Sequence, residues 1–276
     1  MSRPTGALIL AMLLGATVAV AGGADPLAEG YRLMYGLEFD AARVQFLKFE
    51  AQHPEDPRGP VSEAANILFA EFHRLGILES QFLIADRSYV ERSKLMPNAE
   101  ERARFDDALA RSDELARLGL AGDARNTHAL FAMALGYGLR ADYAALIQGR
   151  SYDALQYAFK ASELAKNLLA IDPGYHDAYL STGMSQYIVG NLIFPVRWLL
   201  RLAGYQGDKK EGLRQLRLVA ERGRLLAPFA RLLLALAYLR DNSPEMARML
   251  LVGLRDEFPK NPLFSQEIQR IDGINR

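Results

Sequence analysis

Four histidines and no cysteine are the first residues to consider for chemistry in this chain. Without cysteine the chain has no thiol nucleophile, no disulfide and no cysteine-ligated zinc or iron–sulfur cluster. His53, His73, His128 and His176 lie far apart in sequence. None belongs to the H-E-x-x-H pattern, which places two imidazoles on one helical face to bind a metal. The histidine pattern therefore predicts no metal site.

Other short motifs match catalytic or phosphate-binding sequences only in part. The segment 207–210, Gly-Asp-Lys-Lys, lacks the upstream glycine spacing and the Ser or Thr after lysine that a phosphate-binding loop needs. The segment 184–186, Met-Ser-Gln, follows Gly183 but does not complete the G-x-S-x-G motif. Glu63 and Glu71 are expected to be solvated, as charged side chains usually are. We therefore predict a protein that is not an enzyme and that has no cofactor.

The overall composition excludes further classes of protein. The chain has 276 residues, half of them hydrophobic, with 33 basic and 33 acidic residues. The hydrophobic content excludes a disordered chain. A nucleic-acid binder needs clustered Lys and Arg to contact phosphates, and the balanced charge gives no indication of such a partner.

The start of the chain, residues 1–24, has the parts of a secretory signal. Arg3 is its only charged residue, and the fifteen residues 7–21 are apolar or small. Residues 19–21, Ala-Val-Ala, fit the A-x-A cleavage pattern, and a cut after residue 24 fits nearly as well. An uncleaved anchor is the alternative, because the charge-free stretch just reaches the length of a marginal transmembrane helix. We expect export to the periplasm or cell envelope and one domain over 25–276, with 32 basic against 33 acidic residues and a formal charge of −1.

Beyond residue 25, apolar residues recur at spacings of three and four, with short breaks of Gly, Pro, Asn and Asp. Ala42, Phe46 and Phe49, for example, form one stripe on a helix predicted over about 38–52. That helix ends before Pro54, because the residue preceding a proline avoids the helical conformation. The pattern predicts an all-α protein.

An internal repeat indicates which kind of all-α protein this is. Near the C-terminus, small, aromatic, apolar and proline residues fall at the spacing of a tetratricopeptide repeat (TPR) helix pair: Leu234, Ala235, Tyr238, Ala247, Leu251, Leu254 and Pro259. Four residues of the first unit precede their counterparts Ala235, Ala247, Leu251 and Pro259 by 205 residues, within one residue of six 34-residue periods: Gly30, Ala42, Phe46 and Pro54. In such a unit a small residue on the first helix lets the second helix approach with a large apolar residue. Two units that share the same repeat register predict a right-handed solenoid of about five or six helix pairs.

On these positions the chain resembles the TPR superfamily over about residues 25–261. The segments 137–143, 187–192 and 207–213 also resemble motifs of a bacterial family of exported TPR-like proteins. The last of them is distantly similar to the inclusion-body-clearance and TPR-like proteins of the mitochondrial surface. The resemblance implies a helical solenoid that binds proteins or peptides, with no catalytic residue to carry over.

Three segments depart from the 34-residue unit. A Gly-Asp loop comes at Gly207, about seventeen residues late, which predicts an inserted short helix near 193–204. The stretch 136–173 is thirteen residues longer than a standard unit, which predicts lengthened helices around 139–165. Residues 76–97 are the least regular part and are expected to form a loop over one face of the array.

The first helices of TPR pairs line a concave groove, and the aligned units predict which residues contact a partner there. The predicted groove residues are Tyr31, Met34, Tyr35, Phe69, Met133, Tyr137, Arg140, Met184 and Tyr187. Aromatic, Met and Arg side chains are typical of an adaptable recognition surface, and an open groove would accept an amphipathic helix or an extended peptide. The alternative is that other segments fill the groove, so that these residues are core.

We therefore predict a non-catalytic protein-interaction scaffold of the cell envelope, with a protein or peptide partner and without nucleic acid, metal or cofactor. One alternative is a membrane-associated envelope assembly component, held by its N-terminal segment or by the insertion. Arg197, Trp198 and Arg201 of that insertion suit a lipid surface, although packing of Trp198 on neighbouring repeats is the favoured explanation.

A second alternative is a helical protein that binds or hydrolyses a small molecule. It would require Arg140, Asp142 and Tyr143 to converge in a deep pocket.

Overall fold

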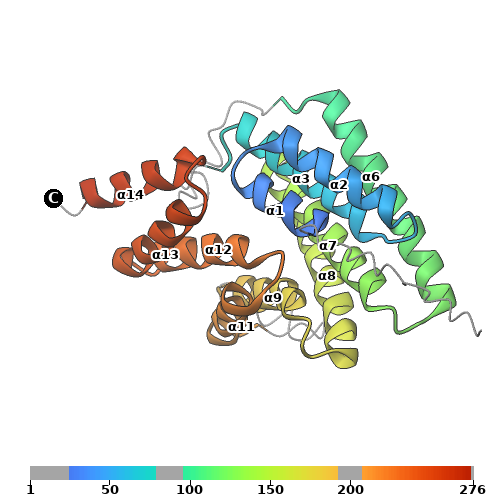
Figure 1. Ribbon diagram of the computed structural model, residues 1–276. Coiled ribbons are helices and arrows are strands. Elements are labelled where there is room, and N and C mark those ends of the chain that lie inside the picture. Colours follow the sequence, from blue (N-terminus) through green and yellow to red (C-terminus); the bar gives the residue numbers. More distant parts are fainter. Residues whose placement is uncertain (1–24, 79–95, 192–206, 275–276) are drawn as a thin grey trace, which may run out of the picture.

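The computed structural model describes residues 25–78, 96–191 and 207–274 (Figure 1). The helices of these ranges are α1 (Pro26–Tyr35), α2 (Phe39–Gln52), α3 (Arg58–Arg74), α6 (Ala99–Gly122), α7 (Thr127–Asp142), α8 (Ser151–Ile171), α9 (Tyr179–Asn191), α11 (Lys209–Arg222), α12 (Ala227–Arg240), α13 (Pro244–Glu257) and α14 (Pro262–Ile274). A π-helical turn, η1 (Tyr143–Ile147), continues α7, and a 3-10 turn, η2 (His176–Ala178), leads into α9. These ranges contain no strand, which confirms the all-α prediction.

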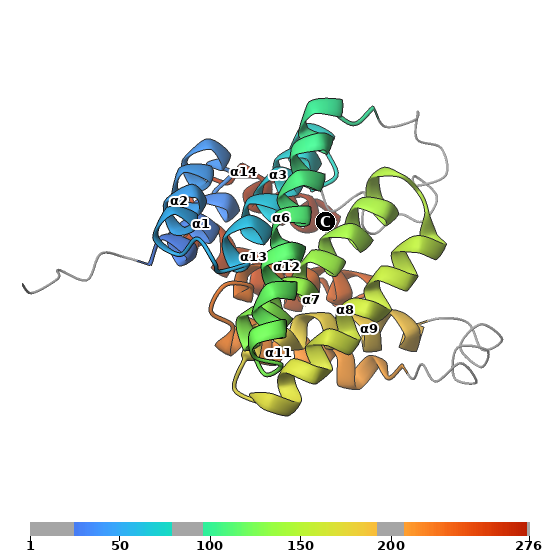
Figure 2. The ribbon, with the colours of Figure 1, turned by 90° about the vertical axis from the view of Figure 1, so that its right-hand side faces the viewer.

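The helices pack as consecutive pairs: α1 with α2, α3 with α6, α7 with α8, α9 with α11, and α12 with α13 (Figures 1 and 2). Helix α14 then packs on α13. The first helices of neighbouring pairs also contact one another, α1 with α3, α3 with α7, and α7 with α9. The described ranges thus hold five helix pairs and a final helix, and the predicted TPR-like helical-hairpin solenoid is confirmed.

Small residues set the close approach of paired helices, as the repeat pattern predicts. A Cβ added to Gly30 on α1 would lie 2.4 Å from the Phe46 ring on α2. Phe46 and Ala42 are fully buried at this contact. Between α9 and α11, a Cβ on Gly212 would lie 2.6 Å from the backbone nitrogen of Tyr187. Only glycine permits these approaches, so each pair buries its apolar stripe against its own partner helix.

The middle pair is longer than a standard repeat, as predicted. Helix α7 and η1 together run from residue 127 to residue 147, and α8 has 21 residues. Three other predictions lie outside the described residues. They concern the signal segment over 1–24, most of the irregular loop over 76–97, and the short helix near 193–204.

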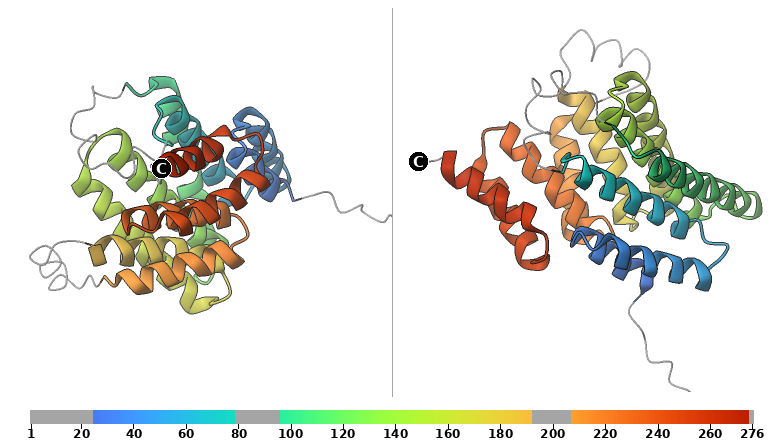
Figure 3. Two further views of the ribbon diagram at one scale, coloured as in Figure 1. Left: turned by 90° about the vertical axis from the view of Figure 1, so that its left-hand side faces the viewer. Right: turned by 90° about the horizontal axis from the view of Figure 1, so that it is seen from above.

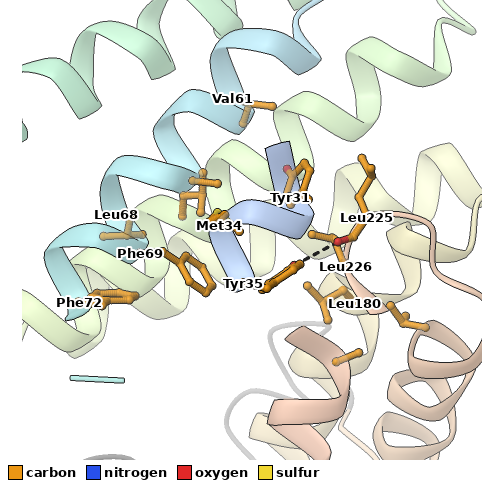
Figure 4. Close-up of a cluster of buried hydrophobic side chains, with 14 of the residues drawn as sticks. Tyr31, Met34, Tyr35, Val61, Leu68, Phe69, Phe72, Leu180, Leu225 and Leu226 are labelled. Atoms are coloured by element: carbon orange, nitrogen blue, oxygen red, sulfur yellow. Dashed lines mark hydrogen bonds between the residues drawn. The ribbon is translucent and has the colours of Figure 1, made fainter. Parts of the chain in front are cut away.

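The first and last units of the solenoid contact one another, and Figure 3 shows the last helices beside the first. Tyr35 at the end of α1 donates a hydrogen bond to the Leu225 carbonyl oxygen at 3.1 Å, drawn in Figure 4. The Asn261 side-chain amide donates to the Tyr35 carbonyl oxygen at 2.9 Å. The rings of Phe69 on α3 and Phe229 on α12 meet edge to face, with centroids 5.4 Å apart. The concave side is therefore closed where the two ends of the array meet.

Candidate functional site

Closure buries most of the residues that the sequence predicts in an open groove. Tyr31, Met34, Tyr35, Phe69 and Tyr187 are each at most 8 % exposed, and Figure 4 shows four of them packed together. In the described structure these five side chains are core residues, because the end units meet and the concave side packs there. Partner contact through the predicted groove residues stays a prediction.

The two buried tyrosines at this core have hydrogen-bond partners. The Ser62 hydroxyl donates to the Tyr31 hydroxyl oxygen at 3.1 Å, while Tyr35 donates to Leu225 as described above. Burial raises the pKa of both tyrosines above the usual value. Both phenols therefore stay neutral, and their hydroxyls connect helices instead of acting as bases.

The other predicted groove residues of the described chain are half-buried: Met133, Tyr137, Arg140 and Met184. Two cations flank the Tyr137 ring, the Arg140 guanidinium at 5.4 Å and the Lys160 ammonium at 5.5 Å from its centroid. Arg140 also donates to an Asp113 carboxylate oxygen at 2.5 Å. Arg197, Trp198 and Arg201, predicted for a membrane or partner contact, lie outside the described residues.

Arg140, Asp142 and Tyr143 do not converge. Arg140 pairs with Asp113, whereas the Tyr143 ring stacks on Phe105 with centroids 5.4 Å apart. The Arg102 guanidinium lies 4.0 Å from the Tyr143 centroid. Of the three residues, only Asp142 lines a cavity together with α8, α9 and α12.

One groove does remain open, between the first and last units, and we call it the α1–α14 groove. Its volume is about 420 Å³. Apolar side chains form most of its surface: Met34, Tyr35, Leu37, Phe69, Leu78, Leu232, Ala235, Leu236, Leu239, Leu251, Leu263 and Phe264. Polar side chains of α14 border it: Gln266, Glu267, Gln269 and Arg270. Met34, Tyr35 and Phe69 thus contribute to a groove at one end of the concave side, although each is largely buried.

Glu63 and Glu71, expected to be solvated, are buried at 6 % and 5 % exposure. Each has an arginine partner, Arg111 at 2.6 Å for Glu63 and Arg74 at 2.7 Å for Glu71. Glu71 also accepts the Asn98 backbone N–H at 2.8 Å. The two acids therefore connect α3 to the helix and turn that follow it, which is a structural role.

The described part of the chain holds no group of three or more His, Asp or Glu side chains placed for a metal ion. One stretch, Thr127–Ile147, is long and apolar enough to cross a bilayer by length and composition. However, 56 % of its apolar window is buried inside the protein, because α7 packs between α6 and α8. Burial against neighbouring helices explains its apolar composition.

No family model matches the chain, and no curated protein matches it either. Among solved structures, the chain is similar to TTC0263, a thermophilic TPR protein of Thermus thermophilus. The sequence identity is 16 % and the TM-score 0.45, over 89 % of this chain and 96 % of that one. The consecutive pairing of the helices defines the fold of this chain.

Proposed function

We propose that the protein is a non-catalytic protein-interaction scaffold of the cell envelope, which binds a peptide or amphipathic helix of a partner in the α1–α14 groove. The observation that carries the proposal is the groove itself. It lies where the first and last units of the array meet, and its surface is apolar with a border of polar side chains.

The groove has the composition that helix-binding grooves use. Phe69, Leu236 and Phe264 would contact the apolar face of a bound helix, while Gln266 and Gln269 on α14 are exposed at the border. Apolar anchors inside and hydrogen-bonding groups outside match the two faces of an amphipathic helix.

A photocrosslinking experiment tests this site in cells. A photoreactive phenylalanine replaces Gln269 at the border of the groove, and a second protein carries it at Leu118, which is 52 % exposed on α6. We expect a discrete protein adduct from position 269 and none of the same mass from position 118. The adduct should disappear when Leu239→Arg places a charge in the groove.

A matched charge on another surface provides the control. Leu118→Arg adds the same side chain on α6, so it should leave the adduct from position 269 unchanged. Melting temperatures of both variants show whether the fold is retained. An adduct that persists in Leu239→Arg, or the absence of any adduct, would reject the α1–α14 groove as the partner site.

The envelope location rests on the signal-like segment before the fold. Helix α1 begins at Pro26, and Asp25 caps it by accepting the Leu27 backbone N–H at 3.0 Å, directly after the predicted cleavage region. N-terminal sequencing of the protein recovered from the envelope fraction should give a start at Gly22 or Asp25. An intact start at Met1 in the membrane fraction would favour the uncleaved anchor, and recovery from the cytoplasm would reject export.

A further inference from the structure

A second cavity lies between α7, α8, α9 and α12, and it shares no lining residue with the α1–α14 groove. We call it the α7–α9 cavity; Figure 2 shows α7, α8 and α9 side by side. Its volume is about 290 Å³. Most of its lining is small or apolar: Gly138, Ala141, Ala145, Ala154, Leu155, Ala158, Ala161, Leu180, Met184, Ile188, Phe229 and Leu233. The small side chains of α7 and α8 leave room that larger ones would fill.

Asp142 is the one charged residue among the described residues of this lining. Within the described ranges, no side chain or backbone group donates a hydrogen bond to its carboxylate or pairs with it. The cation nearest in sequence, Arg140, is paired with Asp113 instead. Burial raises the pKa of the Asp142 carboxyl to about 7. The cavity therefore has an apolar wall with one uncompensated acid.

The helix geometry changes directly after Asp142. The π-helical turn η1 follows Asp142, and the Gln148 N–H donates to the Tyr143 carbonyl oxygen at 3.2 Å. This turn ends the helix instead of interrupting it, and π-turns occur at helix C-termini. The turn shifts the phase of the helix after Asp142, with Ala145 still on the cavity side.

Gly138 provides a second indication. It lies inside α7, where glycine is less stable than alanine, and a Cβ at this position would have no other atom within 4 Å. No close helix contact therefore requires the glycine, unlike Gly30 or Gly212. A residue that lowers stability and keeps a cavity open is expected where the cavity has a use.

We propose that the α7–α9 cavity binds a small apolar molecule that carries one protonated amine, with the amine against the Asp142 carboxylate. The apolar part would contact Leu155, Leu180 and Phe229, and the hydroxyls of Ser181 and Ser185 would be available to the remaining N–H groups. An ammonium group compensates a carboxylate that the described residues leave without a partner, whereas an anion would be repelled. The inference is independent of the partner proposed for the α1–α14 groove.

Three molecules with the same apolar body but different charge test the proposal: 1-adamantanamine, 1-adamantanol and 1-adamantanecarboxylate. Isothermal titration calorimetry of each with the full domain at pH 8 compares a cation, a neutral alcohol and an anion. We expect the amine to bind at least about tenfold more tightly than the alcohol, because a charge-assisted hydrogen bond replaces a neutral one. The carboxylate should bind weakest.

Two variants locate the site. Asp142→Asn should lower the affinity for the amine to that for the alcohol, with little effect on the alcohol itself. Gly138→Leu should abolish binding of both, because the new side chain occupies the cavity. Gly253→Leu is the matched control, since a Cβ at that glycine on α13 also meets no atom within 4 Å but faces solvent.

Several outcomes would overturn the proposal. Equal affinity for the amine and the alcohol in the unaltered protein would mean that the cavity does not select a cation. Unchanged binding in Gly138→Leu would place the ligand elsewhere, and no binding of the amine would reject this ligand class at this size. The charge series needs no variant, so the test remains decisive if Asp142→Asn fails to fold.

Discussion

Asp177 and Asp142 line the same small inner cavity beneath α1, yet the protein surrounds their carboxylates in opposite ways. Asp177 accepts three backbone N–H groups, from Arg224 at 3.1 Å, Leu225 at 3.2 Å and Leu226 at 2.9 Å. Asp142 accepts none from the described residues. Burial raises the pKa of both carboxyls, although at Asp177 the three N–H donors oppose that effect. One acid is thus part of the scaffold, and the other is exposed to the cavity without a partner.

Asp177 is a buried acid with a structural role, whereas the role proposed for Asp142 is to bind a ligand. Asp177 fixes the turn before α12, and the Leu225 carbonyl of that turn accepts the hydrogen bond from Tyr35. The acid therefore supports the contact that closes the solenoid. Among the described residues the Asp142 carboxylate has no hydrogen-bond or ion-pair partner, so nothing there offsets the cost of its partial desolvation. Such a cost is typical of functional sites, where stability is lower than it could be.

The largest effect is expected from removal of the structural acid. Asp177→Ala leaves three backbone N–H groups in a buried turn without an acceptor, and we expect a loss of about 3–5 kcal/mol in the free energy of unfolding. Urea unfolding measures it. Asp123→Ala is the matched control, because Asp123 is exposed and also accepts a backbone N–H, from Arg125 at 2.9 Å. The control should lose less than about 1 kcal/mol. A loss no larger at Asp177 than at Asp123 would contradict the structural role.

Replacement of Asp142 is expected to raise the free energy of unfolding, whereas replacement of Asp177 lowers it. The Asp142 carboxyl has a pKa of about 7 in the folded protein, raised from 3.8, so the folded state binds the proton more tightly than the unfolded state. The folded state keeps the proton while the unfolded state releases it above pH 3.8, so stability falls as the pH rises from 3.8 to about 7, and the full cost of the ionised acid is present at pH 8. Asp142→Asn should raise the free energy of unfolding by about 2 kcal/mol at pH 8, less than the full shift implies, because the side chain is only half-buried. The gain should be smaller at pH 5, which lies inside that window, and should vanish below pH 3.8.

Unfolding curves of both proteins at the two pH values provide the measurement. The other titratable residues around the two cavities that Asp142 borders are Tyr31, Tyr35 and Asp177. The tyrosines do not titrate in this range because burial raises their pKa, and Asp177 is common to both proteins. Equal stability of variant and unaltered protein at pH 8 would mean that Asp142 has a partner, and the contrast with Asp177 would be lost.

The repeat units could be predicted from the sequence because their contacts are local. Gly30 and Phe46 are sixteen residues apart, and the same pairing recurs in a fixed period. Closure could not be predicted in this way. The hydrogen bond from Tyr35 to Leu225 joins residues 190 positions apart, and it depends on the rotation that every intervening pair adds. The total rotation of all the helix pairs decides whether the two ends meet, and therefore whether the concave side is open or packed.

The surroundings of Asp142 could not be predicted from the sequence either. Arg140, Asp142 and Tyr143 are neighbours in sequence, but residues one or two positions apart on a helix point in different directions. The π-helical turn from Tyr143 changes the phase again, so these three side chains separate. The sequence signal that was missed is Gly138 four residues before Asp142, among alanines that cannot fill the space.

The smallest predicted effect comes from replacing Gly138, the glycine that lines the cavity beside Asp142. It tests whether this glycine lowers the stability of the protein and at the same time keeps the cavity open. Gly138 and Gly253 each lie four residues before the last residue of an α-helix, and neither would bring a Cβ into contact with another atom. Alanine at either position should therefore raise the free energy of unfolding by about 0.5–1 kcal/mol. Only Gly138→Ala adds its methyl group to the cavity, so only this variant should bind 1-adamantanamine less tightly. Equal gains in stability with unequal losses of binding would show that helix propensity alone does not account for glycine at residue 138. Equal binding in the two variants would leave Asp142 as a desolvated acid with no ligand beside it.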